Sequence, residues 1–218
     1  MIEHSPIAIP PAAADADFAT IAPATLSGDA VYFWMTGLIV PRPIAFVTTL
    51  GPAGLVNAAP FSFFNGVCST PPLVSLAISR RGAELKDTLR NVLERRELVI
   101  NICNAAIAKA ISVAAGDFGP ELSEIELTGL SLLPSTTIKT PRVANAPAQL
   151  ECRLDQAVEV GGGKATLVLA EITMIHVHRA IVDERGRVDI DRLDPLARLS
   201  GTGYARLGER FNIPRGLV

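Results

Sequence analysis

The spacing of apolar residues changes along the chain, and the first clear pattern is helical. Val31, Trp34, Met35 and Leu38 follow the i, i+3, i+4, i+7 spacing of one face of an α-helix. Ser27 stands before this pattern, where its side-chain oxygen can cap the first turn of the helix. The sequence therefore predicts a helix that begins after Ser27 and ends near residue 38.

Most other apolar segments have the length and the β-branched composition of strands. We expect helices at 86–96, 104–115 and 121–127, and strands at 44–50, 55–59, 73–79, 98–102, 148–160 and 165–177. Glycine-rich turns at 51–54 and 161–163 join neighbouring strands into hairpins. Strands outnumber helices and do not alternate with them, as a doubly wound fold would require. The pattern predicts a mainly β (α+β) protein, a β-barrel with peripheral helices.

The pattern also indicates how the chain is organised into domains. Residues 1–26 are rich in alanine and proline and have little periodicity, so we interpret them as an N-terminal arm. From residue 27 to residue 218 there is no internal repeat and no clear boundary. We therefore expect one domain over 27–218, whose length suffices for one substantial core.

Composition and charge narrow the classes of function. Hydrophobic residues make up 49% of the chain and charged residues 19%, and 20 basic residues face 22 acidic ones for a net charge of −2. A near-neutral chain has no basic field for a phosphate backbone, which argues against nucleic-acid binding. The low charge fraction favours additional buried surface, which oligomerisation would supply.

Other features argue against a membrane, a metal or a secreted protein. No apolar run reaches the roughly 18 residues of a membrane span, and the N-terminus lacks the pattern of a signal peptide. Three widely spaced cysteines fit free thiols in a reducing compartment, so a cytoplasmic location is expected. Cys68 and Cys103 lie in apolar runs and are expected to be buried and inert. His176 and His178 share one side of a predicted strand, but no third ligand is recognisable, so no metal site is predicted.

The first candidate for chemistry is the segment 57–65, NAAPFSFFN, which is unusual for a strand. Pro60 removes a ladder donor, and three aromatic residues fall within 61–64. A bend here would present backbone groups, with Ser62 and Asn65, to a flat ligand with polar edges, such as an isoalloxazine ring. An aromatic corner of the core, capped by hydroxyl and amide groups, explains the same pattern.

The second candidate is an anion site at the start of the predicted helix 86–96. The N-terminus of a helix has unpaired N–H groups and a partial positive charge, and Lys86 and Thr88 lie where they could add a cation and a hydroxyl. Arg80 or Arg81 could approach from the end of the preceding strand. A solvated basic turn with Asp87 or Thr88 as an ordinary cap remains the alternative.

Taken together, these segments resemble a known family. The stretches PRPIAFVTT (41–49), NAAPFSFFN (57–65), SRR (79–81), KDTLRN (86–91), LVINICN (98–104) and RLSGTGYARLG (198–208) look like the flavin reductase-like, FMN-binding proteins. The resemblance covers roughly residues 28 to 215. It implies a split β-barrel with Greek-key strands and a homodimer that holds one FMN per subunit near the interface.

The resemblance also implies the residues that hold the cofactor. Thr48 and Thr49 should border the flavin ring, and Arg42 lies near the same pocket or in a surface salt bridge. The ring and the ribityl chain should be lined by Ala59, Pro60, Phe61, Ser62 and Phe63, with Asn65 close by. The phosphate should be surrounded by Ser79, Arg80, Lys86 and Thr88. FMN is expected rather than FAD, although nothing in these residues excludes an adenosine extension.

The implied activity is an FMN-dependent oxidoreductase, with no single catalytic residue identified. Electrons would arrive from NAD(P)H or a protein donor and leave to free flavin, a monooxygenase partner or a small oxidant. The alternative is a flavoredoxin-like electron carrier without a substrate of its own. Related two-component reductases often have a histidine after the hairpin glycines, where this chain reads Gly163-Lys164-Ala165-Thr166, and that difference favours a tightly held FMN.

Overall fold

The computed structural model describes residues 11–213, except 81, 83, 117 and 120. Its helices are α1 (Gly28–Leu38), α2 (Asp87–Arg95), α3 (Ala108–Ala114), α4 (Glu124–Thr128) and α5 (Ile190–Leu193). Its longer strands are β2 (Ala45–Leu50), β3 (Val56–Phe61), β4 (Phe64–Ser69), β5 (Pro72–Ser79), β6 (Glu97–Ile102), β9 (Ala148–Val160) and β10 (Ala165–Val177). Two-residue strands are β1 (Arg42–Pro43), β7 (Leu132–Leu133), β8 (Arg142–Val143), β11 (Ala197–Arg198) and β12 (Tyr204–Ala205).

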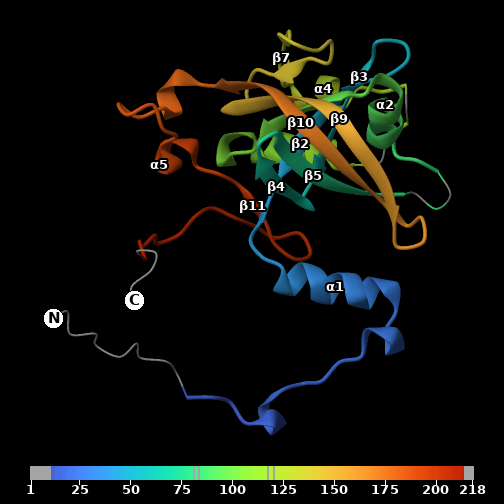
Figure 1. The fold of residues 1–218 in the computed structure, drawn as a ribbon, viewed down its shortest axis with the longest axis vertical. Coiled ribbons are helices and arrows are strands. Elements are labelled where there is room, and N and C mark those ends of the chain that lie inside the picture. Colours follow the sequence, from blue (N-terminus) through green and yellow to red (C-terminus); the bar gives the residue numbers. More distant parts are fainter. Residues whose placement is uncertain (1–10, 81, 83, 117, 120, 214–218) are drawn as a thin grey trace.

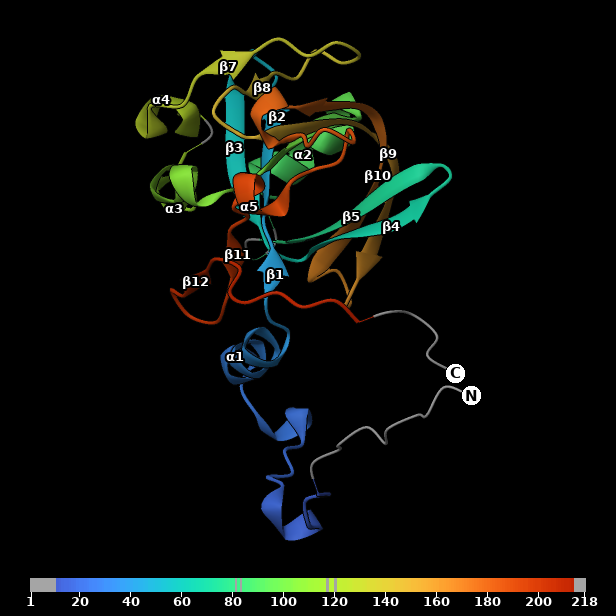
Figure 2. The ribbon, with the colours of Figure 1, turned by 90° about the vertical axis from the view of Figure 1, so that its left-hand side faces the viewer.

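The seven longer strands form one antiparallel sheet in the order β3-β2-β6-β9-β10-β5-β4. The sheet curls so that β3 also contacts β5, which gives the half-closed barrel visible in Figures 1 and 2. β3 and β4 follow each other in the chain yet lie at opposite ends of the sheet. The bend at Ser62 and Phe63 therefore carries the chain from one edge of the sheet to the other, and the Phe63 carbonyl accepts a hydrogen bond from Ala77 N (2.9 Å).

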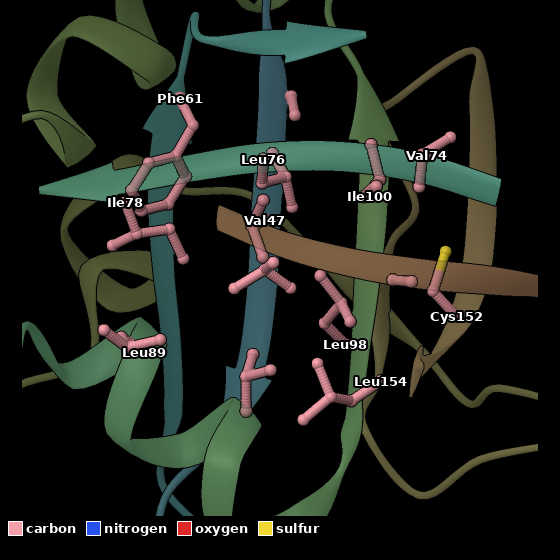
Figure 3. Close-up of a cluster of buried hydrophobic side chains, with 14 residues drawn as sticks. Val47, Phe61, Val74, Leu76, Ile78, Leu89, Leu98, Ile100, Cys152 and Leu154 are labelled. Carbon is pink, nitrogen blue, oxygen red and sulfur yellow. The ribbon is translucent and has the colours of Figure 1, made fainter. Parts of the chain in front are cut away.

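The interior of the barrel is filled by side chains that alternate along the strands. On β5, Val74, Leu76 and Ile78 are buried, while the residues between them are less so. Figure 3 shows these side chains meeting those of Val47 and Phe61 in one cluster. Burial of these apolar side chains is the main contribution to the stability of a barrel of this size.

A second core lies on the outer face of the sheet. Phe46 and Ala58 point outward there and pack against Ile107, Ile111 and Ile125 from the segments around α3 and α4. β2 is therefore buried on both faces, which suits its largely apolar sequence, and its two threonines, Thr48 and Thr49, are buried as well. On the helical segment predicted at 104–115, Ile107, Ile111 and Ala114 are the buried residues. However, the segment begins as a 3-10 turn, Ala105–Ile107, without a side-chain cap from Asn104.

The same outer face carries polar side chains that hold the backbone of the loop 131–147. Glu97 accepts hydrogen bonds from the amides of Lys139 (3.1 Å) and Thr140 (2.8 Å). Asn101 Oδ1 accepts from Val143 N (2.8 Å), and Gln149 Nε2 donates to the Ala146 carbonyl (2.7 Å). These bonds pair backbone N–H and C=O groups of the loop, which has no long neighbouring strand to pair them.

Helix α1 is confirmed, and Ser27 Oγ accepts from Ala30 N (3.2 Å) as its cap. Figures 1 and 2 place α1 and the segment that precedes it outside the barrel. Trp34 is 49% exposed and Leu38 is 74% exposed, although residues between 19 and 26 line an open groove beside them. Residues 11–26 contain only the short 3-10 turns Asp15–Asp17 and Pro23–Thr25, and residues 1–10 of the expected arm lie outside the described residues.

Two expectations about residues 64–69 need correction. β4 was not expected as a strand, because its residues lack alternation; it forms because it pairs with β5 at the sheet edge. That edge position also leaves Cys68 exposed, so the expectation that Cys68 is buried is wrong. Cys103 and Cys152 are buried, and burial raises the pKa of each thiol to about 12.

Candidate functional site

The free edge of β3 is the first component of the site. Ala58 N donates to Glu124 Oε2 (2.8 Å), and the Val56 carbonyl accepts from Ser123 Oγ (2.5 Å). Backbone groups in a strand alternate in direction, so Pro60 also directs its backbone toward this free edge. A proline is tolerated there because its missing N–H would have had no strand partner.

The N-terminus of α2 is the second component. The helix begins at Asp87, with Lys86 as the N-cap residue, and its first-turn amides have no partners within the helix. Its sequence places Leu89 and Val92 into the barrel core, and this packing fixes the direction of the helix axis. Arg90 forms an ion pair with Asp87 in the first turn.

These two components line one pocket of about 130 Å³. Five residues predicted for the cofactor lie together in it: Ala59, Pro60, Phe61, Lys86 and Thr88. The opposite wall consists of residues 114–116 at the end of α3, with Phe118 and Glu124. A strand edge, a helix N-terminus and an aromatic side chain thus meet in a single concavity. Such an arrangement suits a ligand that is planar at one end and anionic at the other.

A buried network of polar side chains supports the pocket from behind. Asn57 Nδ2 donates to Thr88 Oγ1 (2.9 Å) and lies 3.2 Å from Thr49 Oγ1. Thr49 Oγ1 also accepts from Asn91 Nδ2 (3.1 Å). The Thr88 hydroxyl therefore keeps its own proton available for an acceptor in the pocket, while Asn57 fixes its position. Thr49, expected beside the flavin ring, lies in this supporting network instead of in the pocket lining.

Glu124 gives the pocket a titratable wall. Burial raises the pKa of its carboxyl and the negative charge of Asp87 raises it further, while the hydrogen bond from Ala58 N opposes these effects. An anion bound in the pocket would favour the protonated form of Glu124 in the same way that Asp87 does.

Three of the predicted residues form a separate cluster beside α1. Arg42 is 5% exposed, and its guanidinium donates to the carbonyls of Thr36 (2.7 Å), Ile39 (2.6 Å) and Leu199 (2.9 Å). Its Nε lies 3.4 Å from Ser62 Oγ, and its guanidinium lies over the ring of Phe63. Burial lowers the pKa of Arg42. The structure thus places Arg42 neither in the pocket nor in a surface salt bridge: it fastens the end of α1 to the barrel.

The remaining predicted residues are also outside the pocket. Thr48 is fully buried on the opposite side of β2 and donates to the Pro141 carbonyl (2.7 Å). Asn65 is exposed on β4 and accepts from the neighbouring Gly66 N (2.9 Å). Ser79 ends β5, and Arg80 forms an ion pair with Glu159 of β9. Arg81 lies outside the described residues. The structure thus brings Ala59, Pro60, Phe61, Lys86 and Thr88 together in one pocket, and the role of every predicted residue toward a cofactor stays a prediction.

Sequence reasoning missed Asn57 and Glu124 as pocket residues. Asn57 belongs to the unusual segment 57–65, and a polar residue at an inward-facing strand position could have indicated a role for it. Nothing in the sequence distinguishes Glu124 from its neighbour Glu126. Only the packing of α4 against β3 turns Glu124 toward Ala58.

His176 and His178 do not converge on a common point. His176 Nε2 lies 2.6 Å from Glu151 Oε1, and His178 Nδ1 accepts from Ala180 N (3.2 Å). Among the described residues, no three His, Cys, Asp or Glu side chains gather in a way that could hold a metal ion. Over the same residues, no helix combines the length and apolar character required to cross a bilayer.

Comparison with known proteins identifies the class of this fold. The family model for the flavin reductase like domain matches residues 36–195. Nitrilotriacetate monooxygenase component B from Bacillus cereus is 36% identical, with a TM-score of 0.88 over 90% of this chain and 98% of that one. The 2-nitrobenzoate 2-nitroreductase NbaA of Pseudomonas fluorescens is also 36% identical, with a TM-score of 0.83 over 92% and 98% of the two chains.

A more distant structure supports the architecture. A split-barrel-domain protein from Shewanella frigidimarina is 19% identical and has a TM-score of 0.79, covering 88% of this chain and 96% of its own. The fold is therefore a split barrel, as the sequence predicts. The chain belongs to the flavin reductase-like family, a family of flavin-dependent oxidoreductases.

Proposed function

We propose that this protein holds FMN in the pocket between β3 and α2 and transfers electrons through it. The observation that carries the proposal is the convergence of residues 59–61 and 86–88, from two separate segments, on one concavity. Each segment alone has a plain structural explanation. Their meeting at one place suits the two chemically different ends of a flavin mononucleotide.

The phosphate would lie at the N-terminus of α2. The first-turn amides of the helix donate hydrogen bonds toward it, Lys86 supplies a positive charge, and the Thr88 hydroxyl donates a further hydrogen bond. Hydrogen bonds to a charged group contribute about 1.5–3 kcal/mol each. Asn57 holds Thr88 in position and is a positioning residue for this contact.

The isoalloxazine ring would lie along the free edge of β3. Pro60 and Phe61 provide apolar contact, and the backbone at the edge offers hydrogen-bonding groups to the polar rim of the ring. The pocket of about 130 Å³ is smaller than the roughly 300–1,000 Å³ of typical ligand sites, so the ring would extend beyond its mouth. The site would then need a further wall.

A second copy of the chain would supply that wall, and we propose a homodimer. The exposed face of α1 includes Tyr32, Phe33, Trp34 and Leu38, more apolar surface than a helix exposes without a partner. The three free cysteines suit a reducing compartment, so we propose a cytoplasmic location. Sedimentation equilibrium of the purified protein tests the assembly, and a monomeric mass contradicts it.

Bound FMN would supply the redox chemistry, accepting electrons from NAD(P)H or a protein donor and passing them to an acceptor. The chain's own residues would bind and orient the cofactor and shield one side of it from water. No side chain in the pocket is required as a general acid or base. One kind of acceptor is an oxygenase partner, in line with the name of the Bacillus cereus relative, component B of a monooxygenase.

A flavoredoxin-like electron carrier is the second candidate. The hairpin after Gly163 presents Lys164 where related two-component reductases often have a histidine. Rapid bleaching of the bound flavin by NADH or NADPH alone supports the reductase. Failure of both nicotinamides to bleach it supports the carrier.

The binding site is tested by the double variant Lys86→Ala/Thr88→Ala. Removing two phosphate contacts is expected to lower FMN affinity by about 100-fold or more. Riboflavin, which lacks the phosphate, should bind both proteins equally. Isothermal titration with both flavins, after chromatographic identification of any flavin that co-purifies, measures the difference.

The matched control is Lys139→Ala, which removes one exposed cation from the loop on the other side of the sheet. It should leave both affinities within twofold. Unchanged FMN affinity in the double variant, in a protein that retains its thermal transition, would place the phosphate elsewhere.

A further inference from the structure

A second cavity lies where the C-terminal end of β10 meets the loop 131–147. Its volume is about 660 Å³, within the roughly 300–1,000 Å³ of typical ligand sites. Residues 175–179 line one side of it, and residues between 133 and 149 line the other. None of these residues lines the proposed flavin pocket, so the cavity is a separate feature of the molecule.

The charged side chains that line this cavity are basic. Arg142 and Arg179 line it together with His176 and His178, and none of the described residues in the lining is acidic. Within the described part of the chain, neither arginine forms an ion pair. A concave surface that carries charges of one sign concentrates ions of the opposite sign. The cavity is therefore suited to an anion.

Two of the basic side chains are held in place and still keep a donor free. Arg142 donates from Nε to the Pro134 carbonyl (3.0 Å) and from Nη1 to Gln149 Oε1 (3.1 Å), which leaves Nη2 without a partner among the described residues. His178 Nδ1 accepts from Ala180 N (3.2 Å), so the neutral ring carries its proton on Nε2. The buried unpaired side-chain atoms of the described residues belong to other side chains, so a ligand can reach both donors.

His176 supports the cavity wall and is already paired. Its Nε2 lies 2.6 Å from Glu151 Oε1, and hydrogen bonds hold the pKa of Glu151 at about 2, so the ring faces an ionised carboxylate. Glu151 also accepts from the amides of Thr136 and Thr137. The negative charge of Glu151 is therefore met by donors inside the protein and leaves the two arginines unpaired.

The other walls of the cavity are apolar. Leu133 is 40% exposed and Ile175 is 58% exposed, and both line the cavity with Val177 and two alanines, Ala144 and Ala146. An inorganic anion would leave these side chains in contact with water, whereas the apolar body of an organic anion would cover them. A carboxylate also matches the planar fork of a guanidinium group.

We propose that this cavity binds a small organic carboxylate with an apolar body, such as an aromatic acid. The carboxylate would pair with Arg142 and Arg179 and accept a hydrogen bond from His178 Nε2, while the apolar body would lie against Leu133 and Ile175. The site is separate from the flavin pocket, and binding there does not depend on the proposed function.

The test is isothermal titration of the full-length protein with benzoate at low salt. Benzoate is expected to bind with a dissociation constant below about 1 mM. Benzamide has the ring without the charge, and inorganic phosphate has the charge without the ring. Each should bind at least about tenfold more weakly than benzoate.

The double variant His178→Asn/Arg179→Ala removes one donor and one cation and should weaken benzoate at least about tenfold. Asparagine at 178 keeps an acceptor for Ala180 N, and Arg179 is exposed, so the thermal transition should be retained. Arg185→Ala is the matched control, because it removes an exposed cation from the turn 183–186 outside the cavity. This control should leave the benzoate affinity within twofold.

Three results would overturn the carboxylate site. They are equal affinities for benzoate and benzamide, phosphate binding as tight as that of benzoate, and an unchanged benzoate affinity in a double variant that keeps its thermal transition. If the double variant loses that transition, the single variant Arg179→Ala decides. It should weaken benzoate about threefold, and an unchanged affinity would overturn the site.

Discussion

Two networks of buried polar side chains lie on opposite sides of β2, and they differ in how completely they are satisfied. On the outer face, Glu151 accepts from Thr136 N (2.6 Å), Thr137 N (2.6 Å) and the Thr137 hydroxyl (2.7 Å), besides contacting His176. On the pocket side, Asn91 keeps one oxygen without any partner.

The difference indicates what each network is for. A saturated network needs nothing from outside and fixes the loop 131–147 on the sheet. A network with an unsatisfied buried acceptor contributes less stability than a saturated one. We therefore assign stability to the network on the outer face and propose binding for the pocket side, and four substitutions test that division.

The largest effect is expected for Glu151→Ala. This substitution leaves two part-buried amides and a hydroxyl without an acceptor and should lower the free energy of unfolding by about 4 kcal/mol. Urea denaturation measures the change. Glu171→Ala, at an exposed position of β10, is the control and should change it by less than about 0.5 kcal/mol. Equal effects of the two would remove the structural role assigned to Glu151.

The stability that Glu151 contributes should depend on pH. Burial alone would raise the pKa of Glu151, but the hydrogen bonds from Thr137, Thr136 and His176 outweigh it and hold the pKa at about 2. A folded-state pKa below the unfolded value contributes stability above pH ~4.5, and this contribution is lost as the pH falls toward 2. The contribution is on the order of 3 kcal/mol. Unfolding free energies of the natural chain and Glu151→Gln should therefore converge between pH 4.5 and 2, and a constant difference would contradict this account.

The smallest change in the free energy of unfolding is expected for Asn91→Leu, and Asn101→Leu is its matched comparison. Asn101→Leu removes bonds to the Phe46 carbonyl (2.9 Å) and Val143 N (2.8 Å) and should cost about 2–3 kcal/mol. Asn91→Leu removes one bond to Thr49 together with an unsatisfied oxygen, so its cost should stay below about 1 kcal/mol. Thermal or urea unfolding of both variants provides the comparison. A larger loss from Asn91→Leu would reverse the assignment of the two networks.

Local patterns in the sequence predicted much of the fold. The strands β9 and β10 begin and end where their apolar runs do, and Gly161, Gly162 and Gly163 adopt the positive φ values that their hairpin turn requires. Ser27 caps α1 as expected. These features depend on neighbours in the chain, which the sequence displays directly. β4 could not be predicted in this way, because its strand conformation comes from pairing with β5.

The sequence by itself determined the mainly β class, the family resemblance and the two segments, 57–65 and 86–88, that supply the pocket. Only the tertiary structure decided which of their residues face it. In the folded chain, Thr48 lies on the outer face and Arg42 binds the end of α1. Arg80 pairs with Glu159, and Glu124 lies at the edge of β3. The physical reason is that the direction of a polar side chain depends on partners that are distant in sequence. Local periodicity predicts helices and strands, but it does not identify partners that are distant in sequence.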